Sequence, residues 1–217
     1  MREKATRMRM LNAVGLLGCL TLAAGLAGCR VHEEKNANGE DKKVQVDTPF
    51  GGIHVNSDQT TAADLGLPVY PGAQVTPDSG NGKSADVQMG FGVWKLRVKI
   101  VNYTAADSQD KVVAFYKKGL ARYGDVIACQ DGASVGTPAK TAEGLGCDDE
   151  KQPNVYVSGN SASYGYHSDE KGYQLKAGSK RRQHIVAFNS SAPGQTRFSL
   201  MDFDLPAGTS GGGGKSD

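Results

Sequence analysis

Histidine and cysteine are the residue types in this chain best suited to metal binding or nucleophilic chemistry, and the sequence has four of each. The histidines are widely separated: His32, His54, His167 and His184. No two of them have the spacing that places two metal ligands on one helix turn or across one hairpin. His167, with Asp169 and Glu170, forms the one local cluster of possible ligands, and a solvated loop explains it better. The sequence therefore predicts neither a metal site nor a bound cofactor.

Nucleophilic catalysis has no local signature that we recognise. We find no strained G-x-S-x-G turn joining a strand to a helix, the feature that presents the serine of many hydrolases. A serine, a histidine and a carboxylate from distant segments can still meet in a folded protein. A hydrolase with a site assembled around His167 or His184 therefore stays open as an alternative. We assign no catalytic residue and expect a protein that is not an enzyme.

Aromatic side chains offer a third kind of chemistry, which is stacking against a ligand. Tyr156, Tyr164, Tyr166 and Tyr173 are concentrated in one polar stretch of the chain. Tyrosines in loops and edge strands are typical of recognition surfaces, including those that stack on sugar rings. Trp94 would add to such a surface if it is exposed. A module that binds a small ligand or a glycan is therefore a further alternative.

The first 28 residues have the layout of an export signal. A basic start is followed by an apolar run over residues 11–27 that ends in small residues. This arrangement is typical of a secretory signal peptide and not of a membrane-spanning helix. We therefore expect residues 1–28 to be removed from the mature protein.

The residues at the end of this run, Leu26-Ala27-Gly28-Cys29, resemble the lipobox of bacterial lipoproteins. The resemblance implies that the Cys29 thiol receives a diacylglyceryl group, that the chain is cut before Cys29, and that the new N-terminus is acylated. Acylated Cys29 would then hold the protein on the lipid bilayer. Leu16-Leu17-Gly18-Cys19 is a rival lipobox, but cleavage there would leave an apolar start on the mature chain.

The residue after the anchor bears on location within the cell envelope. Arg30 occupies the position where lipoproteins retained in the inner membrane of enterobacteria usually have Asp. By this resemblance we expect an envelope protein that faces the periplasm from the outer membrane.

The charge of the mature chain excludes one class of partner. Residues 1–28 contain four of the 25 Lys and Arg residues and one of the 23 Asp and Glu residues. The remaining 189 residues carry 21 basic against 22 acidic side chains, a net charge near −1. Such a balance gives no field that would attract nucleic acid, so we expect none as a partner.

Cys129 and Cys147 are the two cysteines that follow the export segment. The periplasm is oxidising, and two cysteines in an exported domain most simply pair. Their spacing fits neither a C-x-x-C redox motif nor a zinc knuckle. We therefore expect a structural disulfide, for which the chain-entropy model gives roughly 3 kcal/mol of stabilisation.

Alternating polarity predicts an antiparallel sheet. Trp94, Leu96, Val98 and Ile100 fall on one face of a strand, and the basic residues between them fall on the other. One buried and one wet face is typical of an antiparallel sheet. Similar signals predict about eight short strands, with hairpins near residues 44–55, 86–103 and 183–205.

One amphipathic helix is expected at about residues 108–124. Asp107 or Ser108 would cap its start and Gly124 would end it. Apolar and aromatic side chains recur at helical spacing: Val112, Val113, Phe115, Tyr116, Leu120 and Tyr123. We expect this stripe to pack on the apolar face of the sheet, which gives an α+β fold.

The composition divides the chain into four parts. Residues 1–28 form the signal, and residues 29–43 are charged and polar enough to predict a disordered tether. A single domain is expected over residues 44–206, followed by a glycine-rich flexible tail at 207–217.

Two further segments carry a second resemblance. LPVYPGA (residues 67–73) and VVAFYKKGL (residues 112–120) are similar to a pattern found in uncharacterised bacterial envelope lipoproteins. The pattern brings no activity with it. From these features we expect a protein that binds or scaffolds an envelope protein partner through its sheet edge and its tyrosine-rich loops.

Overall fold

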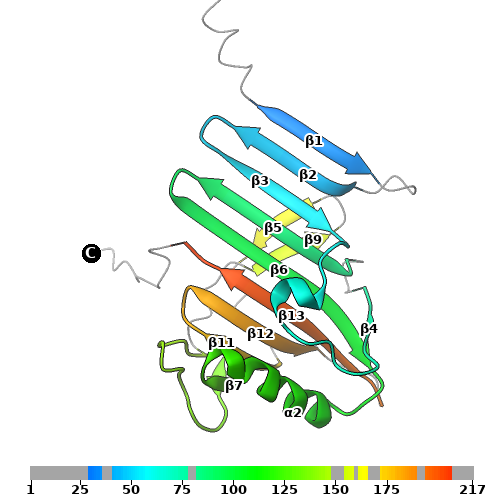
Figure 1. The fold of residues 1–217 in the computed structure, drawn as a ribbon, viewed down its shortest axis with the longest axis vertical. Helices are drawn as coiled ribbons and strands as arrows, with labels where there is room; N and C mark the ends of the chain where they lie inside the picture. The colour runs from blue at the N-terminus through cyan, green and yellow to red at the C-terminus, as the bar shows by residue number, and fades with distance from the viewer. Residues whose placement is uncertain are drawn as a thin grey trace, which may run out of the picture.

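The protein folds into an open antiparallel sheet with one main helix, as a computed structural model shows (Figure 1). The structure describes residues 29–35, 41–77, 82–147, 154–158, 161–165, 172–189 and 194–206. No helix in those ranges is long and apolar enough to cross a membrane.

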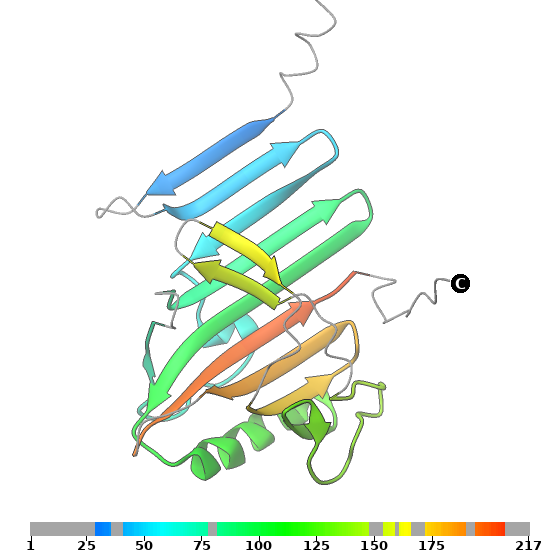
Figure 2. The ribbon, with the colours of Figure 1, turned by 180° about the vertical axis from the view of Figure 1, so that it is seen from behind.

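Eleven strands form the large sheet. They are β1 (Arg30–Lys35), β2 (Asp41–Thr48), β3 (Gly51–Ser57), β4 (Gln74–Val75), β5 (Ser84–Phe91), β6 (Trp94–Ala105), β7 (Val126–Gln130), β8 (Ala133–Ser134), β11 (Tyr173–Gly178), β12 (Arg182–Asn189) and β13 (Thr196–Asp204). Their order across the sheet is β1-β2-β3-β5-β6-β13-β12-β11-β7-β8, and β4 pairs with the last part of β6. Strands β9 (Asn154–Ser158) and β10 (Ser161–Gly165) form a separate hairpin on the face opposite the main helix (Figure 2).

The main helix, α2 (Gln109–Leu120), has Ser108 at its N-cap position and continues into the 3-10 turn η2 (Ala121–Tyr123). The side chains of Val112, Tyr116 and Leu120 are fully buried against the sheet. A second short 3-10 helix, η1 (Ala62–Leu65), lies over the same face of the sheet (Figure 1). The helical stripe expected from the sequence is thus the face that α2 buries.

The helix covers a different face of β6 from the one we expected. Val101, Tyr103 and Ala105 pack with α2 in the largest core cluster. Leu96 and Val98 have the opposite parity along the strand, so they lie on the other face, in a second cluster. The sequence misleads here because β6 is apolar at even positions in its first half and at odd positions in its second.

The two segments of the second resemblance contact each other. The Tyr70 ring meets Phe115 edge-on with centroids 5.2 Å apart, and the backbone N–H of Tyr70 donates to the Tyr116 hydroxyl over 3.2 Å. The Tyr123 hydroxyl donates to the carbonyl of Gly66 over 2.7 Å. These contacts hold the extended segment after η1 against α2.

Two sequence expectations about the sheet are corrected. The eight short strands are an underestimate, since the large sheet alone has eleven. The tether expected at residues 29–43 instead contains β1 and the start of β2. Val31 pairs with Val46, and Glu34 forms an ion pair of 2.9 Å with Lys43, so this polar segment gains cross-strand partners. The expected signal at 1–28 and tail at 207–217 lie outside the described residues.

Candidate functional site

A row of charged and polar side chains crosses the face of the sheet that α2 and η1 also cover. The strand register places Asp86, Lys99, Asp202 and His184 opposite one another on β5, β6, β13 and β12 in turn. Arg97 lies on the same face of β6, two residues from Lys99. These five residues, which we call the polar row, bring five titratable side chains together on one face of the sheet.

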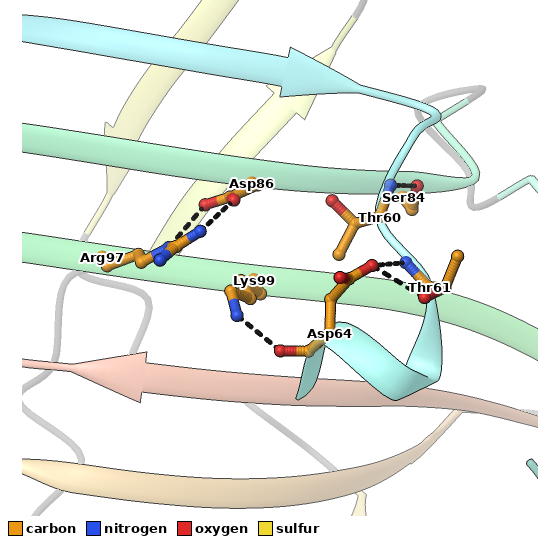
Figure 3. Close-up of polar contacts among 7 residues, drawn as sticks. All are labelled: Thr60, Thr61, Asp64, Ser84, Asp86, Arg97 and Lys99. Carbon is orange, nitrogen blue, oxygen red and sulfur yellow. Dashed lines mark hydrogen bonds and ion pairs between the residues drawn. The ribbon is translucent and has the colours of Figure 1, made fainter. Parts of the chain in front are cut away.

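One end of the polar row is neutralised by direct ion pairing (Figure 3). The Arg97 guanidinium donates two hydrogen bonds to the Asp86 carboxylate, over 3.0 Å and 2.6 Å, and Asp86 holds the pKa of Arg97 above its usual value. Lys99 donates to the backbone carbonyl of Asp64 in η1. The Asp64 carboxylate accepts hydrogen bonds from Thr61, which lower its pKa. These charges are therefore used inside the molecule: the Arg97–Asp86 pair joins β6 to β5, and the Lys99 hydrogen bond ties η1 to β6.

The other end of the polar row is a histidine–carboxylate pair. The Nδ1 atom of His184 lies 3.4 Å from Oδ1 of Asp202, and the imidazole stacks on the Tyr123 ring with centroids 3.5 Å apart. The guanidinium of Arg122 lies 5.2 Å from the centre of the same ring. Burial lowers the pKa of His184 and raises that of Asp202, while the attraction between them opposes both shifts.

This pair has the residue types of a general base. No serine, threonine or cysteine side chain among the described residues hydrogen-bonds His184, and its buried Nδ1 makes no hydrogen bond. A triad needs the nucleophile within hydrogen-bond reach of the imidazole. The described geometry supports a packing role for His184 against Tyr123.

One serine motif escaped our sequence interpretation. Gly132-Ala133-Ser134-Val135-Gly136 matches the letters of G-x-S-x-G. The structure places Ser134 in β8, a two-residue exposed edge strand that pairs with β7. Because no helix follows this turn, it is not the strand-to-helix elbow that activates a serine.

The disulfide expected from the sequence is present. The sulfur atoms of Cys129 and Cys147 are 2.00 Å apart and their Cα atoms 5.7 Å apart. Both side chains are buried in a small cluster with Ile127 and Leu145. The bridge therefore ties the loop after β8 to the sheet.

The aromatic residues do not form one surface within the described part of the chain. Tyr173 is half-buried and packs on Phe188, and Trp94 is half-buried against the second core cluster. Tyr156 and Tyr164 belong to β9 and β10, whose side chains lie outside the described part. Tyr166 and His167 also lie outside the described residues, so the expected tyrosine surface remains a prediction.

A hollow of about 630 Å³ lies beside the first turn of α2. Its lining includes Ser108, Tyr173 and Thr196. The charged groups there are already paired, since Asp107 accepts hydrogen bonds from Lys111 over 2.7 Å and from the Tyr70 hydroxyl over 3.0 Å. These hydrogen bonds lower the pKa of Asp107. The hollow is polar and of a size that takes a small ligand.

Metal binding has no site among the residues that the structure describes, where no three His, Cys, Asp or Glu side chains are grouped to hold an ion. Cys29, the expected lipidation site, is exposed and immediately precedes β1.

No protein-family model, curated protein or solved structure matches the chain.

Proposed function

We propose that this protein is a bacterial envelope lipoprotein, anchored through acylated Cys29 and facing the periplasm from the outer membrane. The lipobox-like residues before Cys29 support this proposal, as does the exposure of Cys29 at the start of β1. The disulfide also suits an oxidising compartment.

Mass spectrometry of the protein isolated from membranes tests the anchor. We expect a chain that begins at Cys29 and carries added acyl mass. The variant Cys29→Ser should leave the membrane fraction, with Ser134→Ala as the matched control that stays in it. An unlipidated chain with a free Cys29 thiol contradicts the proposal.

The anchored domain, we further propose, binds or scaffolds an envelope protein through the edge strand β1. The observation that carries this is the position of β1, which ends the sheet and has no strand on its outer side among the described residues. An edge strand presents unpaired backbone N–H and C=O groups that a partner strand can join. Its exposed Val31 adds an apolar contact.

Crosslinking in the native envelope tests this partner. A photoreactive residue at His32, exposed on β1, should give a covalent product with one protein, whereas the same residue at Lys118, exposed on α2, should give none. The proposal is wrong if β1 yields no protein product while the purified chain retains a defined small molecule.

A second candidate, binding of a small ligand, is favoured by the hollow beside α2. Native mass spectrometry of the purified chain should then reveal a bound molecule. Gln195→Trp, which places a large side chain at an exposed lining position, should abolish retention while the His32 crosslink persists. Retention that is unchanged by Gln195→Trp contradicts this site.

No nucleophile accompanies His184 among the described residues, so we do not propose a hydrolase.

A further inference from the structure

Several turns and one chain segment meet at a single end of the sheet, on the left in Figure 1. A continuous cross-strand row joins Arg30, Asp47, Gly52, Gly90 and Lys95. The turns β2–β3 and β5–β6 lie just beyond this row. The start of β1, and therefore Cys29, lies level with both turns.

Exposed apolar side chains concentrate at this end. Phe50 in the β2–β3 turn is 83% exposed, and Val93 in the β5–β6 turn is fully exposed. Phe91, 48% exposed, packs on Trp94 with ring centroids 6.1 Å apart. Val31 at the start of β1 is also exposed. Single exposed apolar residues need no explanation, but these come from three neighbouring segments at one end. We call Phe50, Phe91 and Val93 the apolar tips.

The distances suit a common surface. Four strand spacings separate β1 from β6, which amounts to about 19 Å at the usual separation of paired strands. Because β1 begins at Arg30, no tether separates Cys29 from the sheet in the described chain. A surface that holds acyl chains at Cys29 therefore lies within reach of both turns.

The charges at this end also suit lipid headgroups. Arg30 and Lys95 are exposed, and so is Arg181 in the turn between β11 and β12. Two acids lie nearby: the Asp47 carboxylate is engaged by the Gln45 amide over 2.6 Å and by His54 over 3.1 Å, and Asp204 is exposed. Exposed basic side chains beside apolar ones are typical of protein surfaces that rest on anionic phospholipids.

We infer that the apolar tips dock on the phospholipid bilayer beside the acylated Cys29, so that the sheet stands end-on to the membrane. This inference rests on the proposed lipid anchor. The tips add a second contact with the membrane, besides the acyl chains on Cys29. Two contacts fix the orientation of the domain, which one point of attachment does not. The hollow beside α2 is at the opposite end, since Thr196 in its lining pairs with Ala105 at the end of β6. In this orientation the hollow lies at the end of the sheet farther from the membrane.

The single tryptophan of the chain makes the test direct. Trp94 adjoins Val93, so bromine-labelled acyl chains should quench its fluorescence when the tips enter the lipid. The mature lipidated protein is reconstituted into vesicles of phosphatidylethanolamine and phosphatidylglycerol, with and without bromine labels. We expect about twofold quenching for the wild type and most of it lost in the double variant Phe50→Ser/Val93→Ser, since burial in the interface scales with apolar area.

Val75→Ser is the control, because Val75 is another exposed apolar residue, at 47% exposure, but pairs with Tyr103 near the far end of β6. It should be quenched like the wild type. Thermal melts of all three proteins establish that they are folded. A protein that carries acyl mass and floats with the vesicles, yet shows no quenching, overturns tip docking and leaves the anchor intact. Equal quenching in the double variant also overturns it. Absence of acyl mass on Cys29 contradicts both the anchor and the docking that rests on it.

Discussion

Two halves of one sheet differ in what covers them. Strands β6, β13, β12 and β11 lie beneath α2, where Val112, Tyr116 and Leu120 are fully buried. The other half, the wing formed by β1, β2 and β3, extends away from α2 (Figures 1 and 2). None of the described side chains of the wing is fully buried. Both halves have the same antiparallel pairing. The difference teaches that strand pairing with only marginal packing builds the wing, whereas packing of a second layer stabilises the half under the helix.

The largest expected effect is at the centre of the covered half. Phe198 is buried and lies against the rings of Tyr103 and Tyr116, with centroids 5.6 Å and 5.4 Å away. Phe198→Ala should lower the free energy of unfolding by about 3–5 kcal/mol, because it removes apolar contacts and leaves a cavity. Urea unfolding measures this. A loss smaller than that caused by Ile53→Ala in the wing would contradict the stated difference between the two halves.

The disulfide is the next largest contribution. The bridge closes 18 residues of sequence separation beside the covered half. The paired variant Cys129→Ser/Cys147→Ser should lose roughly 3 kcal/mol, by the chain-entropy model of loop closure. Urea unfolding of this variant against the wild type reports the loss, and crosslinking from His32 should be unaffected. Unchanged stability would show that the bridge does not constrain the unfolded chain.

In the wing, Ile53 packs only at the margin of the second cluster. Ile53→Ala should lower the free energy of unfolding by about 1 kcal/mol, less than the 2–5 kcal/mol typical of a fully buried site.

Hydrogen exchange should also be faster in β1 and β2 than in β12 and β13, because local openings of the wing break few packing contacts. Slow exchange throughout would indicate that the wing is covered in solution.

A smaller effect is expected in the pH dependence of stability. Burial lowers the pKa of His184 below its usual value of 6.5. The unfolded chain therefore binds more protons than the folded one at mildly acidic pH, and the free energy of unfolding falls as pH drops below about 6.5. Burial raises the pKa of Asp202 above 3.8, which contributes the opposite slope. His184→Gln removes the first effect, and it also removes the attraction that holds down the pKa of Asp202, so both changes act in the same direction. Melting between about pH 7 and pH 5 should therefore show less acid destabilisation in the variant than in the wild type. Equal slopes would contradict the burial of His184.

The smallest effect belongs to the ion pair at the exposed end of the polar row. The Arg97 side chain is 45% exposed, and water screens its attraction to Asp86. Arg97→Ala should cost less than about 1 kcal/mol, as exposed pairs usually do. Thermal melts of Arg97→Ala beside Phe198→Ala measure the difference, and a loss as large as that of Phe198→Ala would mean that the polar row supports the fold.

Local patterns made several features predictable. Helical spacing and the cap at Ser108 gave α2 nearly in full, although its last turn is the 3-10 helix η2. Alternation gave the hairpins β2–β3 and β5–β6. The pairing of Cys129 with Cys147 followed from the count of cysteines after the export segment. The helix and the hairpins depend on residues that are near one another in the sequence. The disulfide was predictable because only two cysteines follow the export segment.

The candidate site could not be predicted in the same way. The sequence places Lys95, Arg97 and Lys99 on one face of β6 but does not give their neighbours. Asp86 and Asp202 become partners only through strand register across β5 and β13. Polarity predicted a tether where β1 forms, because the stabilising partners of that segment lie on β2. Pairing between strands is decided by tertiary contacts that no local pattern contains.

The sequence by itself determined the periodic elements and the disulfide pair, because spacing and side-chain chemistry act over short stretches of chain. The tertiary structure alone decided that α2 covers the face of Val101 and Tyr103 and not that of Trp94 and Leu96. It also decided that Cys29 lies level with Phe50 and Val93, which strand order and register bring to one end of the sheet. Both outcomes depend on how distant segments share buried area and backbone hydrogen bonds, so only the assembled fold fixes them.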